Sequence, residues 1–443
     1  MNGQTSIEMP TYQQVCEQLS ALESRGICLG LARMQRLMAK LGDPQEQLQF
    51  VHIAGTNGKG STATMLAKIM QCSGYRTGLF TSPEVLELRE YLQIDGEMIS
   101  QEDFTGCAKR VLTVADAWED EDRPTLFEVK TAIAFVWFLE RQCDIVCLEA
   151  GLGGAEDSTN VIPPPLLQII TAIDMDHVAI LGPELSDIAR AKAGIIKGGI
   201  TVSYLKQPPE ALQVLRERCR DVGSKLLLPA PDKLKILQTD WRFGCFCYDG
   251  VEYQKALAGE FQVYNALTAI TAARALREIG WKLTEEAVQS GLQGAVICAR
   301  LEVLSERPLV ILDGSHNPQA MRALKQTLQA LRREADMSAG RKLTLLMGVL
   351  ADKGYREMLS SVVPLTDRFL AVSPSNPRAL PAAELAAAAK AHCQEVHFYD
   401  DHAAAVQAAL ADLAPNDVLV VCGSLYLAAD VRPILTSKEL EKI

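Results

Sequence analysis

A glycine-rich stretch with one lysine is the clearest chemical feature of this chain of 443 residues. It reads QFVHIAGTNGKGS over residues 49–61. An apolar segment typical of a buried strand comes first, and glycines follow that let the backbone turn sharply and approach a ligand. N–H groups at the start of the next helix, with the charge of Lys59, would hold the phosphates of a nucleotide. The predicted nucleotide-binding residues are Gly55, Thr56, Asn57, Gly58, Lys59, Gly60 and Ser61.

One position departs from the common phosphate loop. In that pattern a serine or threonine follows the lysine and its hydroxyl binds magnesium. Here Gly60 follows Lys59, so another oxygen has to take that place. Ser82 is the natural candidate, because it follows a short strand predicted at residues 76–80. The carboxyl ends of parallel strands face the ligand crevice of an open α/β sheet.

Two further polar residues follow apolar segments that we predict to be strands. Glu149 lies near the end of the strand at 144–150, and His177 follows the strand at 168–173. A carboxylate in a buried strand is costly unless it is paired or binds a cation. Magnesium prefers oxygen ligands, and a histidine is an unusual but possible addition. We therefore predict a metal site that includes Glu149 and His177.

Composition narrows the classes of partner. The formal charge of −11 argues against a nucleic-acid surface, and no uncharged apolar run approaches membrane-spanning length. The 12 cysteines are scattered without metal-site spacing, which is typical of reduced thiols in a cytoplasmic protein. We expect small-molecule substrates, no nucleic acid, no membrane and a monomer.

Alternation of strands and helices predicts two doubly wound α/β domains. The larger, residues 1–297, would be a phosphate-loop ATPase domain, and the smaller, residues 298–443, a Rossmann-like domain without a phosphate loop. Within the larger domain we predict a hairpin at 241–253 and a long helix at 259–280. Ser186 is expected to cap the helix that carries Lys192. In the second domain, strands are predicted at 309–312, 342–347, 368–372, 395–398 and 417–421.

Ten motifs occur in one order across the chain. They are HIAGTNGKGST, TSP, FEVKTAIAF, EAGLGGAEDSTN, ITAIDMDH, AKAGIIK, ARLE, LDGSHNP, GVLADK and CGSLYL. In this order they resemble the folylpolyglutamate synthase/dihydrofolate synthase family, a branch of the Mur-ligase-like amide ligases, from about Leu29 to Arg432. The resemblance implies that ATP phosphorylates the carboxylate of a pteroate or folate. The amino group of L-glutamate then attacks the acyl phosphate, and an amide forms.

The resemblance also implies roles for single residues. It places the metal ligands on Ser82, Glu149 and His177, with ATP and two magnesium ions as cofactors. Lys192 matches a lysine that carries a carbamate. Positions around ATP fall on Asn265, Arg300, Asp313 and His316, and positions near the incoming glutamate on His316 and Ser424. Lys59, Lys192 and His316 are the implied catalytic residues.

Five positions differ from the family pattern, and two other functions remain open. The differing residues are Glu84, Ala155, Ala191, Phe261 and Ala299, which leave the preferred acceptor open. The first alternative is a Mur-type amino-acid ligase with a different carboxylate acceptor. The second is a nucleotide-binding regulatory switch, although the guanine-reading N-K-x-D motif is not found.

Overall fold

The computed structural model describes residues 10–119, 122–239, 244–333, 341–411 and 413–436. Contacts divide the chain into two compact units. The first holds the described residues up to Pro229 together with Thr268–Gly291. The second holds Ala230–Leu267 and the described residues from Leu292 onward. The predicted functional division after residue 297 stays a prediction.

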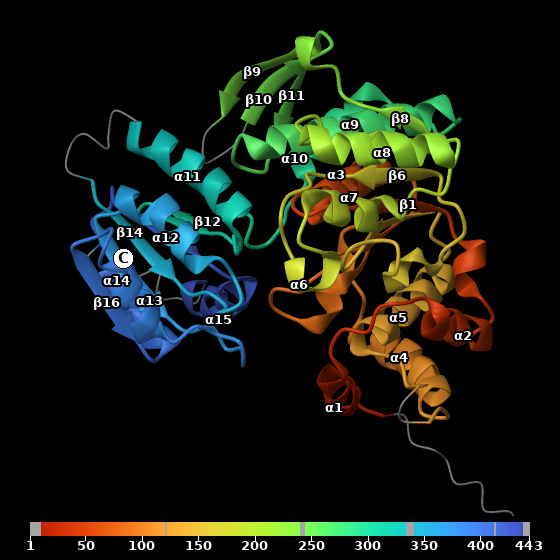
Figure 1. Cartoon of the computed structure of the whole chain (residues 1–443), viewed down its shortest axis with the longest axis horizontal. Helices are drawn as coiled ribbons and strands as arrows, with labels where there is room; N and C mark the ends of the chain where they lie inside the picture. The colour runs from red at the N-terminus through yellow and green to blue at the C-terminus, as the bar shows by residue number, and fades with distance from the viewer. Residues whose placement is uncertain (1–9, 120–121, 240–243, 334–340, 412, 437–443) are drawn as a thin grey trace, which may run out of the picture. The chain divides into compact units, whose positions relative to one another are not determined.

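The first unit is built on an eight-stranded sheet (Figure 1), with the strand order β4-β3-β2-β5-β1-β6-β7-β8. Neighbours from β2 to β8 pair in parallel, and β3 and β4 form an antiparallel hairpin at one edge. The strands are β1 Phe50–Ala54, β2 Thr77–Phe80, β3 Leu92–Ile94, β4 Glu97–Met98, β5 Ile145–Glu149, β6 Leu167–Ile170, β7 Ile200–Ser203 and β8 Lys225–Leu227.

Helices cover this sheet and connect its strands. They are α1 Tyr12–Ala21, α2 Ala32–Lys40, α3 Lys59–Cys72, α4 Gln101–Ala115, α5 Leu126–Glu140, α6 Val178–Leu181, α7 Leu185–Ala193, α8 Pro209–Asp221, α9 Phe261–Glu278 and α10 Glu285–Gly294. Helices α9 and α10 both cross the division between the units. Phe50 and Phe80 pack with α1, α2, α4 and α5 in one core. This packing fixes β1 and β2, whose carboxyl ends lead into the predicted site.

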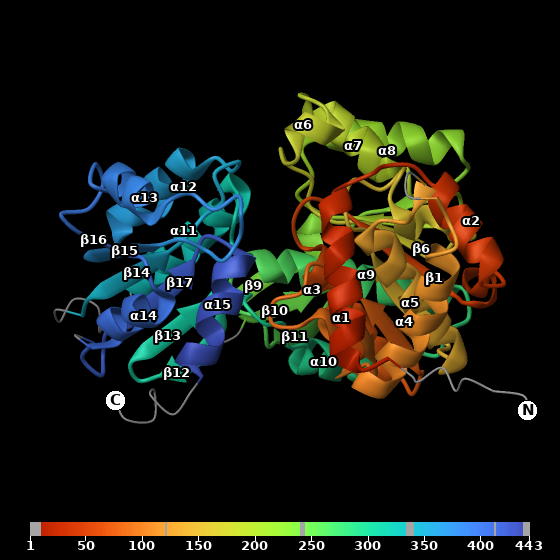
Figure 2. The ribbon, with the colours of Figure 1, turned by 90° about the horizontal axis from the view of Figure 1, so that it is seen from below.

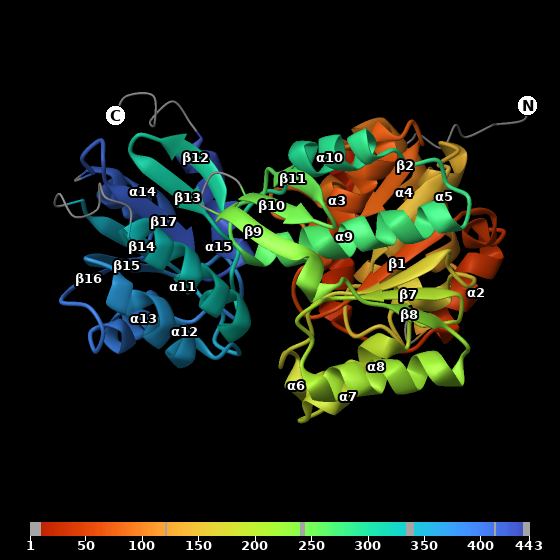
Figure 3. The same ribbon diagram turned by 90° about the horizontal axis from the view of Figure 1, so that it is seen from above.

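The second unit contains two sheets. Figure 3 shows the smaller one, the antiparallel strands β9 Leu234–Thr239, β10 Gly244–Tyr248 and β11 Val251–Lys255. The larger has the order β12-β13-β17-β14-β15-β16 (Figure 2), and only β12 is antiparallel. Its strands are β12 Glu302–Glu306, β13 Leu309–Leu312, β14 Leu343–Met347, β15 Arg368–Val372, β16 Glu395–Tyr399 and β17 Val418–Cys422. The helices are α11 Pro318–Arg333, α12 Tyr355–Val362, α13 Ala382–Ala389, α14 His402–Ala411 and α15 Leu425–Leu435.

The two predicted α/β sheets are confirmed, and two local predictions and one unpredicted strand need comment. The hairpin forms around Asp249 and Gly250, although residues 241–243 lie outside the described residues. The added strand β9 was not predicted. Ser186 does not cap its helix, because Glu184 is the N-cap and forms a capping box with Asp187. No helix in the described part of the chain is both long and apolar enough to cross a membrane.

Candidate active site

The phosphate loop lies between β1 and α3, as predicted. Gly55 has a φ of 155°, and a Cβ there would lie 1.9 Å from the Thr171 hydroxyl oxygen. Gly58 has a φ of 87° and directly precedes the helix. Both positions therefore require glycine. The first N–H groups of α3 have no acceptor within the helix, so the start of α3 is suited to an anion.

The front of the loop is held by the chain that follows β6. The backbone N–H groups of Thr56 and Asn57 donate to the carbonyl of Ala172, at 2.8 and 3.2 Å. The Thr56 hydroxyl donates to the Asp174 carbonyl at 2.9 Å. These two loop N–H groups are therefore already used within the protein, and the prediction that the loop binds phosphate rests on the N–H groups nearer Lys59.

Glu149 ends β5 beside the phosphate loop, and its side chain is buried. Its Oε2 accepts the Ser82 N–H at 3.2 Å, and its Oε1 lies 3.8 Å from the Lys59 ammonium nitrogen. A Cβ at Gly60 would lie 3.3 Å from Glu149 Oε2. A serine or threonine after Lys59 would thus press on the carboxylate. The structure brings together Ser82, Glu149 and the loop, and a side chain at residue 60 would be in tight contact with the carboxylate.

His177 lies in the segment after β6, as the N-cap of α6. Its φ is 51° and 41% of its side chain is exposed. Its Nε2 is 3.9 Å from Asp176 Oδ2, and its N–H donates to Asp176 Oδ1 at 2.9 Å. Among the described side chains, no group of three His, Cys, Asp or Glu is placed to hold a metal. The predicted set contains only two residues of these types, and as a metal site it stays a prediction.

Lys192 is buried at the back of the phosphate loop. Its ammonium nitrogen donates to the Gly55 carbonyl at 2.8 Å. Burial, followed by the nearby charge of Lys59, lowers the pKa of Lys192 to about 7, while Asp176 and Asp157 act in the opposite direction. A large fraction of this side chain is therefore a neutral amine near neutral pH.

A buried polar network next to β1 was not predicted. The Asp157 carboxylate accepts hydrogen bonds from the N–H groups of Leu152 and Thr159, at 2.7 and 3.0 Å. These hydrogen bonds lower the pKa of Asp157, but burial has the larger effect and raises it. The Thr159 hydroxyl lies 2.9 Å from His52 Nε2. Burial and Lys197 lower the pKa of His52 to about 3, so the imidazole is neutral. The only signal in the sequence was the polar run at 157–160 after the paired glycines.

The second unit gathers other predicted residues around the turn after β13. Asp313 accepts the N–H groups of Leu301 and Ser315, at 2.9 and 3.0 Å, and the Ser315 hydroxyl. His316 Nδ1 lies 3.0 Å from the Gly314 carbonyl oxygen. The Ser315 carbonyl accepts the N–H of Gly423, which directly precedes Ser424. The carboxyl ends of the neighbouring strands β13 and β17 therefore bring these residues together.

The two remaining predicted residues also belong to this unit. Arg300 is half-buried, and its Nη1 would lie 2.7 Å from a Cβ at Gly314, so it lies against the same turn. Asn265 is buried in α9 and donates to Gln262 Oε1 at 2.9 Å. The contact division assigns Lys59 and Lys192 to the other unit. The roles of all these residues toward ATP and glutamate stay predictions.

Four of the five unusual positions have clear surroundings. Glu84 pairs with the buried Lys130 of α5, with Oε1 and Nζ 3.0 Å apart. A Cβ at Gly194 would lie 2.2 Å from the Ala155 Cβ, so that glycine accommodates Ala155. The Ala191 carbonyl accepts the Ala155 N–H at 2.8 Å. Ala299 has a φ of 53°, which explains why glycine suits this position.

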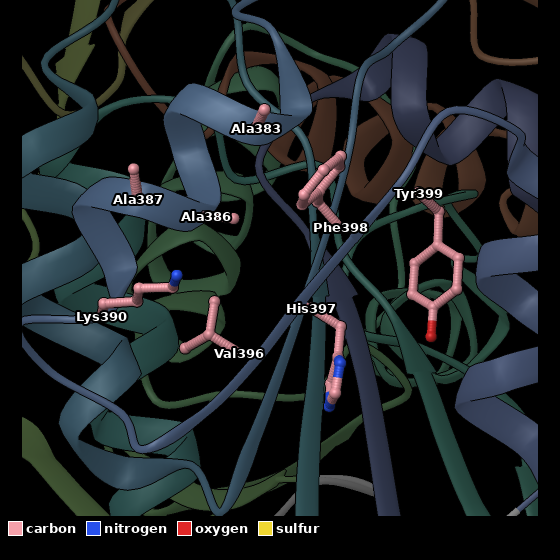
Figure 4. A pocket seen from close by; sticks show the side chains of 8 residues that line it. All are labelled: Ala383, Ala386, Ala387, Lys390, Val396, His397, Phe398 and Tyr399. Atoms are coloured by element: carbon pink, nitrogen blue, oxygen red, sulfur yellow. The ribbon is translucent and has the colours of Figure 1, made fainter.

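A pocket of about 350 Å³ lies elsewhere in the second unit, between α13 and β16 (Figure 4). Strands β14 and β15 separate β16 from β17 and β13, so the pocket is at the far edge of the sheet from Asp313. It contains none of the predicted site residues. Its lining is Ala383, Ala386, Ala387, Lys390, Val396, His397, Phe398 and Tyr399.

Comparison with known proteins agrees with this arrangement. The Mur ligase middle domain matches residues 53–273, and the glutamate ligase domain of Mur ligases matches residues 299–425. The chain is 34% identical over 424 residues to the dihydrofolate synthase/folylpolyglutamate synthase of Bacillus subtilis, covering 92% of this chain and 95% of the relative. The chain belongs to the folylpolyglutamate synthase/dihydrofolate synthase family.

Solved structures of this family share the fold. E. coli FolC in complex with DHPP and ADP superposes with a TM-score of 0.84 and 27% identity, covering 97% of this chain and 99% of that one. A bifunctional folylpolyglutamate synthase/dihydrofolate synthase with Mn, AMPPNP and L-glutamate bound gives a TM-score of 0.81 and 28% identity, covering 97% and 100%. The chain is thus an ATP-dependent ligase with the two domains of this family.

Proposed function

We propose that this enzyme joins L-glutamate to the carboxylate of dihydropteroate and of reduced folates, including their polyglutamates, through an acyl phosphate. A carboxylate oxygen of the acceptor attacks the γ-phosphorus of ATP, and ADP leaves. The amine of glutamate then attacks the acyl carbon, inorganic phosphate leaves with that oxygen, and the amine loses a proton. A carboxylate has no good leaving group, so the phosphorylation step is required.

One observation carries the proposal: the buried carboxylate of Glu149 faces the phosphate loop. It lies 3.8 Å from Lys59 and accepts the N–H of Ser82 at 3.2 Å. A buried carboxylate beside a phosphate site is unfavourable unless a cation shares the space. Its carboxylate oxygens, with the Ser82 hydroxyl, are the type of ligand that magnesium prefers.

We propose that Ser82, Glu149 and His177 hold a divalent metal, because their oxygen and nitrogen atoms are of a type that such an ion can accept as ligands. The relative with Mn and AMPPNP, a member of the same family, supports a metal–nucleotide site here. A bound divalent ion supplies positive charge to the phosphate oxygens. Lys59 and the start of α3 supply further positive charge and alignment, which are the main needs of phosphoryl transfer.

We further propose that Lys192 is carbamylated and helps hold a second magnesium ion. Because the pKa of Lys192 is about 7, a large fraction of its side chain is a neutral amine. This amine would add to CO2 and release a proton. The product is an anion in place of a cation. Its position at the Gly55 carbonyl, behind the phosphate loop, supports this role.

Exposed apolar side chains in the first unit support a flat acceptor. Apolar groups that remain exposed in clusters commonly mark a binding surface. Six large apolar side chains are exposed on three segments of this unit: the loop before α2, the loop after Ser82 and the region of α6. They are Ile27, Leu29, Leu86, Met175, Val178 and Ile180. We propose that these segments receive the pterin and aminobenzoyl groups, while Arg300, Asp313, His316, Asn265 and Ser424 serve ATP and glutamate.

The test is a comparison of acceptors with purified protein. Phosphate release is measured with ATP, saturating L-glutamate and either dihydropteroate or tetrahydrofolate, and kcat/KM is obtained for each. We expect glutamate-dependent turnover with both. Turnover with only one acceptor would restrict the enzyme to a single activity. Turnover with neither would favour a Mur-type ligase with a different carboxylate acceptor.

A further inference from the structure

The backbone on both sides of Arg300 is strained. Ala299 and Leu301 have φ values of 53° and 50°, in the left-handed region that is unfavourable for a residue other than glycine. Both side chains are buried, whereas Arg300 is half-buried. Left-handed backbone at two positions so close together persists only where the surrounding structure enforces it. Such strain is concentrated at functional sites.

Two contacts from the turn after β13 enforce this backbone. The Ala299 carbonyl accepts the Gly314 N–H at 2.7 Å, and the Leu301 N–H donates to Asp313 Oδ2 at 2.9 Å. Arg300 therefore lies between two hydrogen bonds that join its neighbours in the chain to the residues that follow β13. These hydrogen bonds continue the antiparallel register in which Glu302 pairs with Leu312.

A third support comes from α15. The Ala299 N–H donates to Glu302 Oε2 at 2.9 Å. Arg432 of α15 donates to the same carboxylate. Its Nη2 is 2.6 Å from Oε1, and its Nε is 3.0 Å from Oε1 and 3.1 Å from Oε2. The two side chains are only 23% and 16% exposed. Figure 2 shows α15 beside β12, where Glu302 begins the strand.

We propose that Glu302 and Arg432 are positioning residues that hold Arg300 in the strained geometry needed for turnover. The proposal rests on the proposed function, in which Arg300 acts on the nucleotide. Arg432 orients the Glu302 carboxylate, which accepts the hydrogen bond from the Ala299 N–H. This hydrogen bond stabilises the left-handed backbone next to Arg300 and so sets the direction of the Arg300 side chain. Ser424 is the N-cap of helix α15, so the same helix links the proposed glutamate-side position to Arg432, which supports the Arg300 turn.

The test compares Arg432→Ala and Glu302→Gln with Arg332→Ala. Arg332 is a matched control, because it is 27% exposed and pairs with Asp367 at 2.6 Å in the same unit. We expect kcat to fall about 10- to 100-fold in Arg432→Ala, since small displacements of a catalytic group have effects of this size. The dissociation constant of ATP should change less than threefold. Added guanidine at non-denaturing concentration should restore part of the turnover of Arg432→Ala and none in Arg332→Ala.

Amide hydrogen exchange over residues 296–306 gives a readout that does not depend on activity. We expect faster exchange in Arg432→Ala and unchanged exchange in Arg332→Ala. Unchanged exchange in Arg432→Ala, or equal kinetic losses in both arginine variants, would overturn the proposal. Faster exchange with normal turnover would also overturn it. Absence of glutamate ligation in the unmodified protein would instead refute the proposed function, and the exchange experiment would still show whether Arg432 supports this turn.

Discussion

Among single residues, we expect Lys59 to be the cation on which phosphoryl transfer most depends. It lies at the first position of α3, and its ammonium nitrogen is within 3.8 Å of Glu149. We expect Lys59→Ala to lower kcat about 10²- to 10³-fold, as loss of one preorganised electrostatic group does. Lys68→Ala, on the same helix with its Nζ 2.7 Å from Gln71 Oε1, is the control. Phosphate-release rates in both variants decide this, and near-normal turnover of Lys59→Ala would refute the assignment.

Lys192 gives a pH dependence of stability with a definite sign. Its pKa is about 7 in the folded protein and 10.5 in the unfolded chain. Between these values the unfolded chain binds a proton that the folded protein does not, so this residue makes the free energy of unfolding rise with pH, by at most about 1.4 kcal/mol per pH unit. Urea unfolding from pH 6 to 10 in CO2-free buffer should show that slope reduced in Lys192→Met. Parallel curves for the two proteins would contradict the lowered pKa.

At the scale of elements, the loop that carries Ser82 is tied to α5. The Lys130 ammonium lies 3.0 Å from Glu84 and 4.2 Å from the Tyr91 ring centroid, and only 4% of the Lys130 side chain is exposed. Breaking the pair should loosen this loop. We expect Lys130→Met to raise the magnesium concentration required for half-maximal nucleotide binding.

Arg110→Ala is the control for this prediction. Arg110 pairs with Glu140 between α4 and α5, and both side chains are nearly half exposed. Exposed pairs contribute little, so its magnesium titration should match that of the unmodified protein. A shift of the same size in both variants would show a general loss of stability in place of an effect on the Ser82 loop.

The elements show what the sequence could and could not predict. The phosphate loop and the strands ending at Glu149 and Leu312 were predictable, because apolar runs end there in glycine and polar residues. Strand β9 could not be predicted, because Leu234–Thr239 mixes apolar and polar residues. The Ser186 cap was wrong because Glu184, two residues earlier, forms a capping box with Asp187, an uncommon use of glutamate.

Contacts between distant residues were also beyond the sequence. Glu84 and Lys130 are 46 positions apart, and Glu302 and Arg432 are 130 apart. In the sequence, each of these four residues looks like an ordinary charged residue at the surface. Only the fold brings them together, so the supports of Ser82 and Arg300 could not be inferred from spacing. In the sequence Gly60 indicates only a missing hydroxyl, and its proximity to Glu149 is visible only in the structure.

At the scale of the whole molecule, the predicted groups belong to two units. Lys59 and Glu149 lie in the first, whereas Arg300 and His316 lie in the second. We expect turnover to require the units to close on the nucleotide and exclude water from the acyl phosphate. Arg300→Ala and His316→Ala should therefore lower the rate of amide formation more than they weaken ATP binding. An equal loss of nucleotide affinity and turnover would contradict this expectation.

An acyl phosphate intermediate can be detected by following a labelled oxygen from the acceptor carboxylate to phosphate. Dihydropteroate labelled with ¹⁸O in its carboxylate is incubated with the enzyme, ATP and L-glutamate, and the released phosphate is analysed by mass spectrometry. We expect one ¹⁸O atom in each phosphate, because the attacking carboxylate oxygen leaves with phosphorus when the amide forms. Unlabelled phosphate released together with the glutamate adduct would contradict it.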